Sequence, residues 1–123
     1  MAPRPQAPDI ALFAEVHDAL LDQVADLLQR AGPALAAGII GLIDDLASDF
    51  GVEDDLMAAL GCDSRAAHAA QHASLLASLR ALPLGDAAAC RAALAALPGW
   101  FEYHLDSWDT LLALALREAA QPI

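Results

Sequence analysis

Apolar residues recur every three or four positions along most of this chain. Apolar side chains with that spacing line one face of an α-helix. The resulting stripes predict helices over residues 10–27, 39–60, 64–82 and 100–119, with a shorter helix over residues 86–97. No segment alternates between apolar and polar residues with a period of two, so we expect no β-strand. The chain should therefore fold as an all-α protein.

Glycine and capping residues indicate where the predicted helices end. Gly32 follows the first helix, and Gly61 follows the second. Asp63 or Ser64 can cap the third helix, because a side-chain oxygen at that position accepts a hydrogen bond from a free backbone N–H group. Asp86 can cap the short helix in the same way. The links between the helices are therefore expected to be short.

Short links between amphipathic helices favour antiparallel neighbours. We predict an up-down-up-down antiparallel four-helix bundle with a short extra helix or kink before the last helix, because Pro98 and Gly99 interrupt the helical pattern. The proline-rich residues 1–9 are assigned to a flexible leader, and residues 10–123 to the bundle. A chain of 123 residues is long enough to bury one core but not two.

Charge and hydropathy argue against several classes of partner. The formal net charge is -11 and the six basic residues are single arginines, so we expect neither nucleic acid nor an anionic membrane as a partner. The uncharged run over residues 31–43 is shorter than the roughly 20 residues that span a bilayer. Residues 1–8 lack the apolar core of a signal peptide. We expect a cytoplasmic protein in which Cys62 and Cys90 are free thiols.

The apolar stripes also carry polar residues that are costly to bury. These are the four histidines of the chain and three carboxylates: His17, Asp49, Glu53, His68, His72, His104 and Asp109. A single histidine on an apolar face is most simply a core residue with a hydrogen-bond partner. The whole set would need several buried carboxylates to be paired, and the arginines are too few and too scattered for that. A metal site inside the bundle explains all of these residues together.

The spacing of the polar residues supports a shared site. Residues four apart lie one above the other on the same face of a helix. His68 and His72 can therefore bind one ion, and Asp49 and Glu53 can point into the bundle together. Imidazoles and carboxylates suit iron, manganese or zinc, and argue against a thiolate site. Seven donors are too many for one ordinary ion, so two metals bridged by carboxylates are the simplest interpretation.

The remaining acidic residues near these positions are assigned differently. Asp109 follows His104 by five residues, which places it obliquely to that histidine but within reach of a second metal. Asp54 and Asp55 fall on the outward, solvated face of their helix. Ferritin-like di-metal bundles use Glu-x-x-His pairs, and this sequence contains none. The four-residue spacing points to a different family.

The motifs around the polar residues resemble those of the hemerythrin family. The segment DFGVEDDLM from Asp49 is similar to the family pattern HFxxEExLM, except at its first position. HAAQHASLL from His68 is similar to HxxxH followed by a Leu pair, and WFEYHLDSWD from Trp100 is similar to WLxxHIxxxD. HDAL from His17 resembles the HxxL of the first helix in the family. The resemblance covers nearly the whole chain after the leader.

The resemblance implies a centre of two iron ions. By position, His68, His72 and His104 would bind one iron, and Glu53 and Asp109 would bridge the pair. Manganese or zinc at one of the two positions would suit the same donors.

The resemblance also implies that His17 holds the second iron. In the family this iron has another histidine and an open position where O2 binds, and here Asp49 replaces that histidine. Because an anionic oxygen ligand favours the oxidised metal, Asp49 should lower the reduction potential and speed autoxidation. Asp49 could also bind through both oxygens and close the open position.

The expected function is that of a hemerythrin-like, non-haem di-iron protein that binds O2 or a related small oxidant in oxygen handling or sensing. The replacement at Asp49 keeps a second hypothesis open, a di-metal oxidoreductase that activates O2 or peroxide. A third hypothesis is an interaction module in which the metal only stabilises the bundle. No residue pattern identifies an organic substrate, and the protein partner is unknown.

Overall fold

All regular structure in the described part of the chain is helical. The computed structural model describes the backbone of residues 7–120, and the side chains of residue 13 and residues 15–119. The elements are α1 (Ala7–Leu27), α2 (Gly32–Leu60), α3 (Arg65–Arg80), α4 (Ala87–His104), the π-helical segment η1 (Leu105–Asp109) and α5 (Thr110–Ala120). Residues 7–120 contain no strand, so the all-α prediction is confirmed for them.

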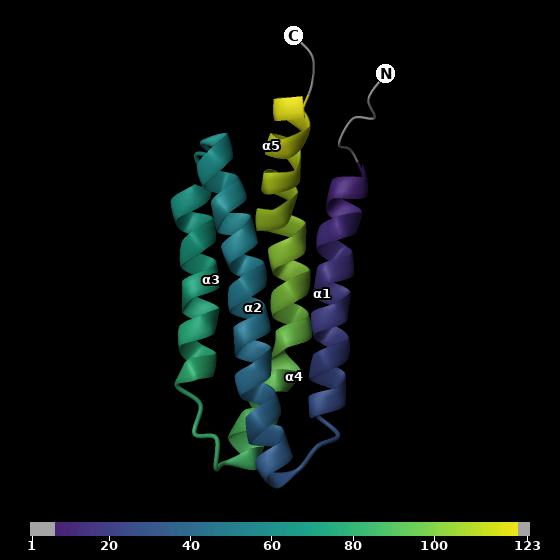
Figure 1. Cartoon of the computed structure of the whole chain (residues 1–123), viewed down its shortest axis with the longest axis vertical. Coiled ribbons are helices and arrows are strands. Elements are labelled where there is room, and N and C mark those ends of the chain that lie inside the picture. The colour runs from purple at the N-terminus through teal and green to yellow at the C-terminus, as the bar shows by residue number, and fades with distance from the viewer. Residues whose placement is uncertain (1–6, 121–123) are drawn as a thin grey trace.

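The helices lie side by side along one long axis (Figure 1). α4, η1 and α5 follow one another without a loop and form one rod beside α1, α2 and α3. α1 begins and α5 ends at the same end of the molecule. This arrangement is consistent with a helical bundle.

Two predicted helix starts differ from the structure. α1 begins at Ala7, so the last three residues assigned to the leader are helical, and residues 1–6 lie outside the described part of the chain. α2 begins at Gly32, well before the apolar stripe that predicted a helix from residue 39. The side chain of Ile10, the first residue of the predicted stripe in α1, lies outside the described residues.

Glycines turn the chain at both ends of α2. Gly32 has φ 57° and Gly61 has φ 65°, a left-handed conformation that glycine adopts without steric penalty. Gly61 N–H donates to the carbonyl of Ala58, and Cys62 N–H donates to that of Met57, which satisfies carbonyls at the end of the helix. These bonds end α2 at the predicted glycine.

One of the predicted caps is confirmed. Asp86 Oδ1 accepts a 3.0 Å hydrogen bond from the Ala89 N–H at the start of α4. Ser64 occupies the N-cap position of α3, but its side chain makes no capping hydrogen bond. α3 therefore begins without the side-chain cap that its sequence offers.

Arg91 ties α4 to the end of α1. Its guanidinium donates to the carbonyl oxygens of Leu28 at 2.7 Å and of Arg30 at 2.6 Å. Carbonyls at the C-terminal end of a helix have no partner within the helix, so this contact satisfies groups that would otherwise need water. The interaction joins two elements that are far apart in the sequence.

The prediction that Pro98 and Gly99 end a separate short helix is wrong, and the alternative, a kink, stays a prediction. α4 continues through both residues to His104. A proline inside a helix costs about 3 kcal/mol, because it lacks an N–H and crowds the preceding turn. Leu97 and Phe101, on either side of this point, are both buried in the core. Burial of these side chains opposes the local cost, and the irregular turn of this rod lies further along, in η1.

Among the described side chains, the apolar core forms two clusters with a polar layer between them. The larger cluster includes Leu20, Phe50, Leu94 and Phe101, and the smaller one consists of Phe13, Met57, Leu112 and Ala113. In α1, buried His17 lies between a residue of each cluster, and in α2 buried Glu53 does the same. The two apolar clusters therefore shield these polar residues from solvent at both ends of the polar layer.

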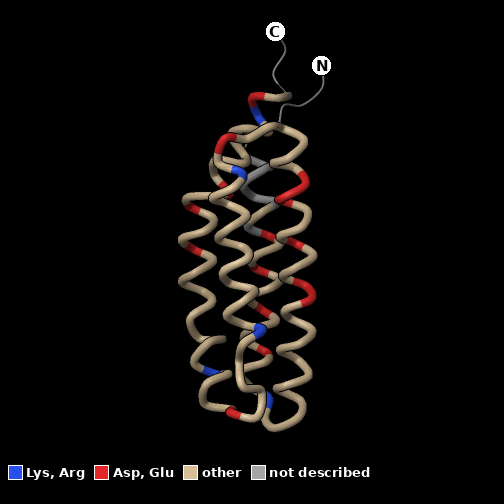
Figure 2. Tube along the Cα trace, turned by 90° about the vertical axis from the view of Figure 1, so that its left-hand side faces the viewer, with Lys and Arg blue, Asp and Glu red and all other residues tan. Residues whose placement is uncertain are grey.

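Acidic residues outnumber basic ones along the chain, 17 against 6. Figure 2 shows Asp and Glu spread along the length of the bundle, with the few arginines towards its two ends. None of the helices within residues 7–120 combines the length and the low polarity needed to cross a bilayer.

Candidate metal centre

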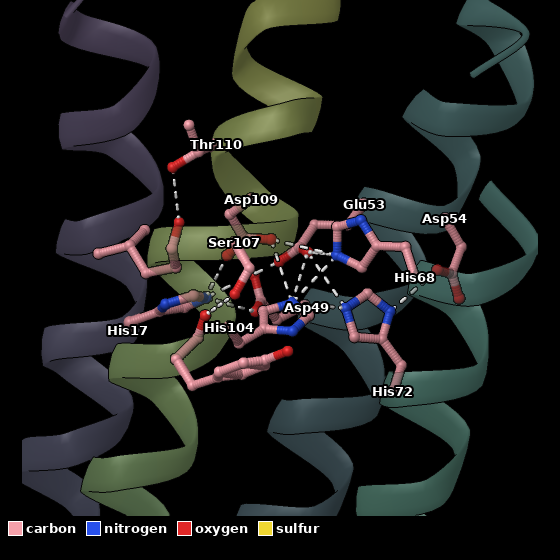
Figure 3. Close-up of polar contacts among 12 residues, drawn as sticks. His17, Asp49, Glu53, Asp54, His68, His72, His104, Ser107, Asp109 and Thr110 are labelled. Carbon is pink, nitrogen blue, oxygen red and sulfur yellow. Dashed lines mark hydrogen bonds and ion pairs between the residues drawn. The ribbon is translucent and has the colours of Figure 1, made fainter. Parts of the chain in front are cut away.

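The predicted site residues come together in the polar layer (Figure 3). They are His17 from α1, Asp49 and Glu53 from α2, His68 and His72 from α3, His104 from α4 and Asp109 from η1. All except Asp49 are at most 3% exposed, and the side chain of Asp49 is 15% exposed. Each of the four rods therefore contributes at least one side chain to a buried cluster.

Three imidazole rings converge on one point. The Nε2 atom of His104 lies 3.0 Å from that of His68 and 3.0 Å from that of His72. A single Nε2–H can serve only one such contact, so hydrogen bonding does not account for both. At a metal–nitrogen bond of about 2.1 Å, ligands at a right angle lie about 3.0 Å apart, against about 3.4 Å at the tetrahedral angle. Both spacings match neighbouring corners of an octahedron.

Glu53 presents one oxygen to each side of the cluster. Its Oε1 lies 3.1 Å from the Nε2 of His68, 3.2 Å from that of His72 and 3.4 Å from that of His104. Its Oε2 lies 3.8 Å from the Nε2 of His17. One carboxylate thus faces both the three-histidine group and the single histidine of α1.

Asp109 has the same two-sided placement. Its Oδ1 lies 3.2 Å from His68 Nε2 and 3.1 Å from His104 Nε2, and its Oδ2 lies 3.2 Å from His17 Nε2. Two overlapping sets of side chains could each hold a metal ion: Glu53, His68, His72 and His104, and His17, Glu53 and Asp109. The buried cluster is therefore suited to binding metal.

The close contacts around His17 and Asp109 are not hydrogen bonds. Both oxygens of Asp109, Oε2 of Glu53 and Nε2 of His17 are buried and form no hydrogen bond with any described residue. His17 Nε2 and Asp109 Oδ2 are nevertheless 3.2 Å apart. Leaving a buried polar group unsatisfied costs about 1–3 kcal/mol, and more for a charged group. Donor atoms that converge without pairing are typical of atoms that coordinate one ion.

Asp49 lies at the edge of the cluster. Its Oδ2 is buried, lacks a hydrogen-bond partner among the described residues and lies 3.9 Å from His17 Nε2. Burial, together with repulsion from Glu53, raises the pKa of Asp49 to about 6. The carboxylate faces inward as predicted, but it lies further from its histidine than Asp109 does.

The π-helical turn η1 brings Asp109 onto the same face as His104. On a regular α-helix, residues five apart differ in direction by about 140°, which is why the sequence predicted an oblique placement. In η1 the backbone bonds connect residues five apart, as in the bond from Thr110 N–H to the carbonyl of Leu105. The Thr110 hydroxyl donates to the same carbonyl at 2.9 Å. The wider turn places both site residues over one point.

Residues outside the predicted set hold two of the imidazoles in place. His72 Nδ1 lies 2.9 Å from Asp54 Oδ1, so an Nδ1–H donor to this carboxylate leaves the lone pair of Nε2 directed at the cluster. Phe50 stacks on His72 with ring centroids 4.0 Å apart, and Trp100 stacks on His104 at 4.6 Å. The side chain of Asp54 is 38% exposed, so the predicted solvated face describes it only in part, and its carboxylate also contacts His72 on the neighbouring helix.

Burial and pairing have opposite effects on the pKa values in the cluster. Burial alone would raise the pKa of Glu53, but contacts with the surrounding histidines hold it well below its usual range. Burial alone would lower the pKa of His104, but contacts with Asp109 and Glu53 raise it to about 9. The pKa of His68 is raised for the same reason. At neutral pH a metal ion must therefore displace a proton from His104.

No protein-family model, no characterised protein and no solved structure matches this chain. The resemblance to hemerythrin motifs therefore depends on the residues themselves and on the cluster that they form.

The residues that the sequence did not identify, such as Asp54, carry no spacing signal along their own helix. Their partners are on other helices, so only the folded arrangement identifies them.

Proposed function

We propose that this protein is a hemerythrin-like, non-haem di-iron protein that binds O2 or a related small oxidant. The observation that carries the proposal is the two-sided placement of Glu53 and Asp109. Each offers one oxygen to the group around His104 and the other to His17. Carboxylates placed in this way can bridge two ions, and the imidazoles complete a donor set that suits iron.

The proposal includes the up-down-up-down antiparallel order of the helices. The links over residues 28–31, 61–64 and 81–86 are short, which favours neighbours that run in opposite directions. That order supports the proposed metal centre, because it brings the polar residues of all the helices to the same height in the bundle. The resemblance of the four motifs to the hemerythrin pattern supports the same architecture.

The side chains around the cluster would keep the centre dry and its ligands fixed. The rings of Phe50 and Trp100 cover His72 and His104, and both apolar clusters lie against the polar layer. A reduced di-iron centre supplies the electrons for reversible O2 binding. Exclusion of water limits the loss of those electrons to side reactions.

A second candidate, a di-metal oxidoreductase that reduces O2 or peroxide, is favoured by Asp49. Its Oδ2 lies 3.9 Å from His17 Nε2. The hemerythrin family, which the sequence resembles, has a neutral histidine at this position. Negative charge beside the ion stabilises its oxidised state, so electrons should leave the centre more readily. Asp49 therefore separates a carrier of O2 from a protein that reduces it.

Rapid mixing of the reduced, iron-loaded protein with O2 tests both functions. A spectral change that reverses when O2 is removed supports binding, and an irreversible change supports reduction. Absence of any reaction would contradict both candidates and leave a metal that only stabilises the fold.

The variant Asp49→His tests the role of that carboxylate. We expect the O2-bound form to last longer in this variant, because the second ion would lose one anionic neighbour. Asp45→His is the matched control, since Asp45 lies exposed one turn earlier on α2. An unchanged lifetime and spectrum in Asp49→His would show that Asp49 does not act on the centre.

A further inference from the structure

We infer that, where a choice of metals is present, the centre binds two different ions: a borderline ion such as Fe²⁺ or Zn²⁺ beside His68, His72 and His104, and a harder ion, Mn²⁺, beside His17. We call these the histidine-rich half and the acidic half. The inference rests on the proposed two-metal centre and specifies which metal each half selects. It is independent of whether the loaded protein reacts with O2.

The two halves share their bridging carboxylates but differ in everything else. Glu53 and Asp109 give one oxygen to each half, so they do not distinguish the ions. The histidine-rich half adds three Nε2 atoms, whereas the acidic half adds the Nε2 of His17 and the carboxylate of Asp49. One half is therefore mainly nitrogen, and the other is mainly oxygen.

This difference in donor atoms predicts a difference in metal preference. Imidazole nitrogen suits Fe²⁺ and Zn²⁺, whereas carboxylate oxygen suits Mn²⁺. At a given set of nitrogen and oxygen donors Mn²⁺ binds more weakly than Fe²⁺ or Zn²⁺. Either of these ions should therefore displace Mn²⁺ from the histidine-rich half. The half with the extra carboxylate is the one where Mn²⁺ is at the smallest disadvantage.

The spacing of the donor atoms supports the same assignment. The Nε2 atom of His104 lies 3.0 Å from those of His68 and His72, which fits short metal–nitrogen bonds. Around His17 Nε2 the carboxylate oxygens lie at 3.2, 3.8 and 3.9 Å. A wider set of oxygen ligands accommodates a larger ion. These oxygens and the Nε2 of His17 are buried and unpaired among the described residues, so they form a built site rather than an acidic surface.

Native mass spectrometry of the full chain tests the inference with redox-inert ions. The metal-free protein is given one equivalent each of Zn²⁺ and Mn²⁺. We expect the main species to carry one zinc and one manganese. Loading without discrimination gives a statistical mixture, in which about half of the chains carry one zinc and about a quarter each carry two or none. A mixed species that does not exceed this statistical share would overturn the inference, because it would show that the two halves do not discriminate.

Variants on each half show where each ion binds. Asp49→His should lower the share of mixed zinc and manganese chains to near the statistical half, in favour of dizinc chains and chains without zinc, and Asp45→His should leave the parent distribution unchanged. His72→Gln should instead weaken the first zinc and retain manganese. Asp49→Asn, which preserves the side-chain size, is a second test if Asp49→His does not fold, with helicity by circular dichroism as the check.

The outcomes separate this inference from the proposed function. A mixed zinc and manganese species in a protein whose iron form ignores O2 would support the inference and contradict O2 binding. Reaction with O2 together with unselective metal loading would support the proposed function and contradict the inference. Failure of the chain to bind either ion would contradict both.

Discussion

His104 Nε2 lies 3.1 Å from Asp109 Oδ1, although the two residues are five positions apart on one rod. The π-helical turn Leu105–Asp109 makes this contact possible, because five residues complete little more than one turn there. A π turn inside an α-helix is equivalent to the insertion of one residue. The position of Asp109 in the centre therefore depends on a backbone irregularity.

Removal of Asp106 should preserve the centre. This exposed residue lies within the π turn, and its deletion would leave a regular α-helix in which His104 and Asp109 are four apart and still on one face. We expect the variant to bind as much metal as the parent chain. Metal content after desalting is the measurement.

Removal of Glu102 is the matched control. Glu102 is also exposed, but it lies in regular α-helix just before His104. Its deletion rotates every later residue by about 100°, so metal binding and folding should both suffer. Loss of metal in the Asp106 deletion as severe as in the Glu102 deletion would contradict the role assigned to η1.

Asp54→Ala should weaken metal binding without touching a ligand. The Asp54 carboxylate lies 2.9 Å from His72 Nδ1 and fixes which nitrogen carries the proton. Loss of such a partner typically lowers metal affinity by about 10- to 100-fold. Competition with a chelator measures the change. Asp55→Ala is the control, because Asp55 is exposed, and equal effects of the two variants would refute the orienting role of Asp54.

Metal binding at pH 7.5 should release protons. The pKa of His104, raised to about 9, lies above its ordinary 6.5, so without metal this imidazole is protonated at that pH. For each proton displaced, the apparent affinity should rise about tenfold per pH unit until the pH reaches the raised pKa. Calorimetric titration in two buffers with different ionisation enthalpies gives the number of protons. A buffer-independent heat would contradict the prediction.

The same shift gives a pH dependence to the stability of the metal-free fold. A histidine whose pKa is raised by folding stabilises the folded state. This stabilisation is complete at pH values below the ordinary pKa, and it is lost as the pH rises through the raised pKa. For His104 the loss falls between pH 6.5 and about 9. Denaturant titrations of the metal-free protein across that window should show decreasing stability. Constant stability would mean that His104 does not pair with Asp109 and Glu53.

Arg91→Ala should destabilise the bundle without altering its metal content. The substitution removes two hydrogen bonds to carbonyls beyond α1, which we expect to cost about 1–3 kcal/mol of unfolding free energy. Arg65→Ala serves as the control, because Arg65 is exposed at the start of α3 and its loss should stay within about 0.5 kcal/mol. Similar unfolding curves for the two variants would contradict the role of Arg91.

Much of this fold and of its cluster could be predicted from residue spacing. His68 and His72 share a helical face because they are four apart, and the same holds for Asp49 and Glu53. Side chains on regular helices therefore came together as expected. Gly61 likewise ended its helix where left-handed backbone was required.

The errors arose where contacts distant in sequence decide the local structure. Pro98 was predicted to break or kink a helix, and α4 continues through it without a break, because the local cost is visible in the sequence and the burial of its neighbours is not. The π turn before Asp109 has no spacing signal of its own. Asp54 carries no sign of its role, since its partner His72 lies on a different helix.

Metal content tests the central claim, that Glu53 and Asp109 bridge two ions, most directly. Metal-free protein is loaded with excess Fe²⁺ without oxygen, desalted and analysed for iron and protein. The account predicts two iron ions per chain in the parent protein, and one in His17→Ala, which loses only the second position. A parent chain that retains no iron, or only one ion, would contradict it.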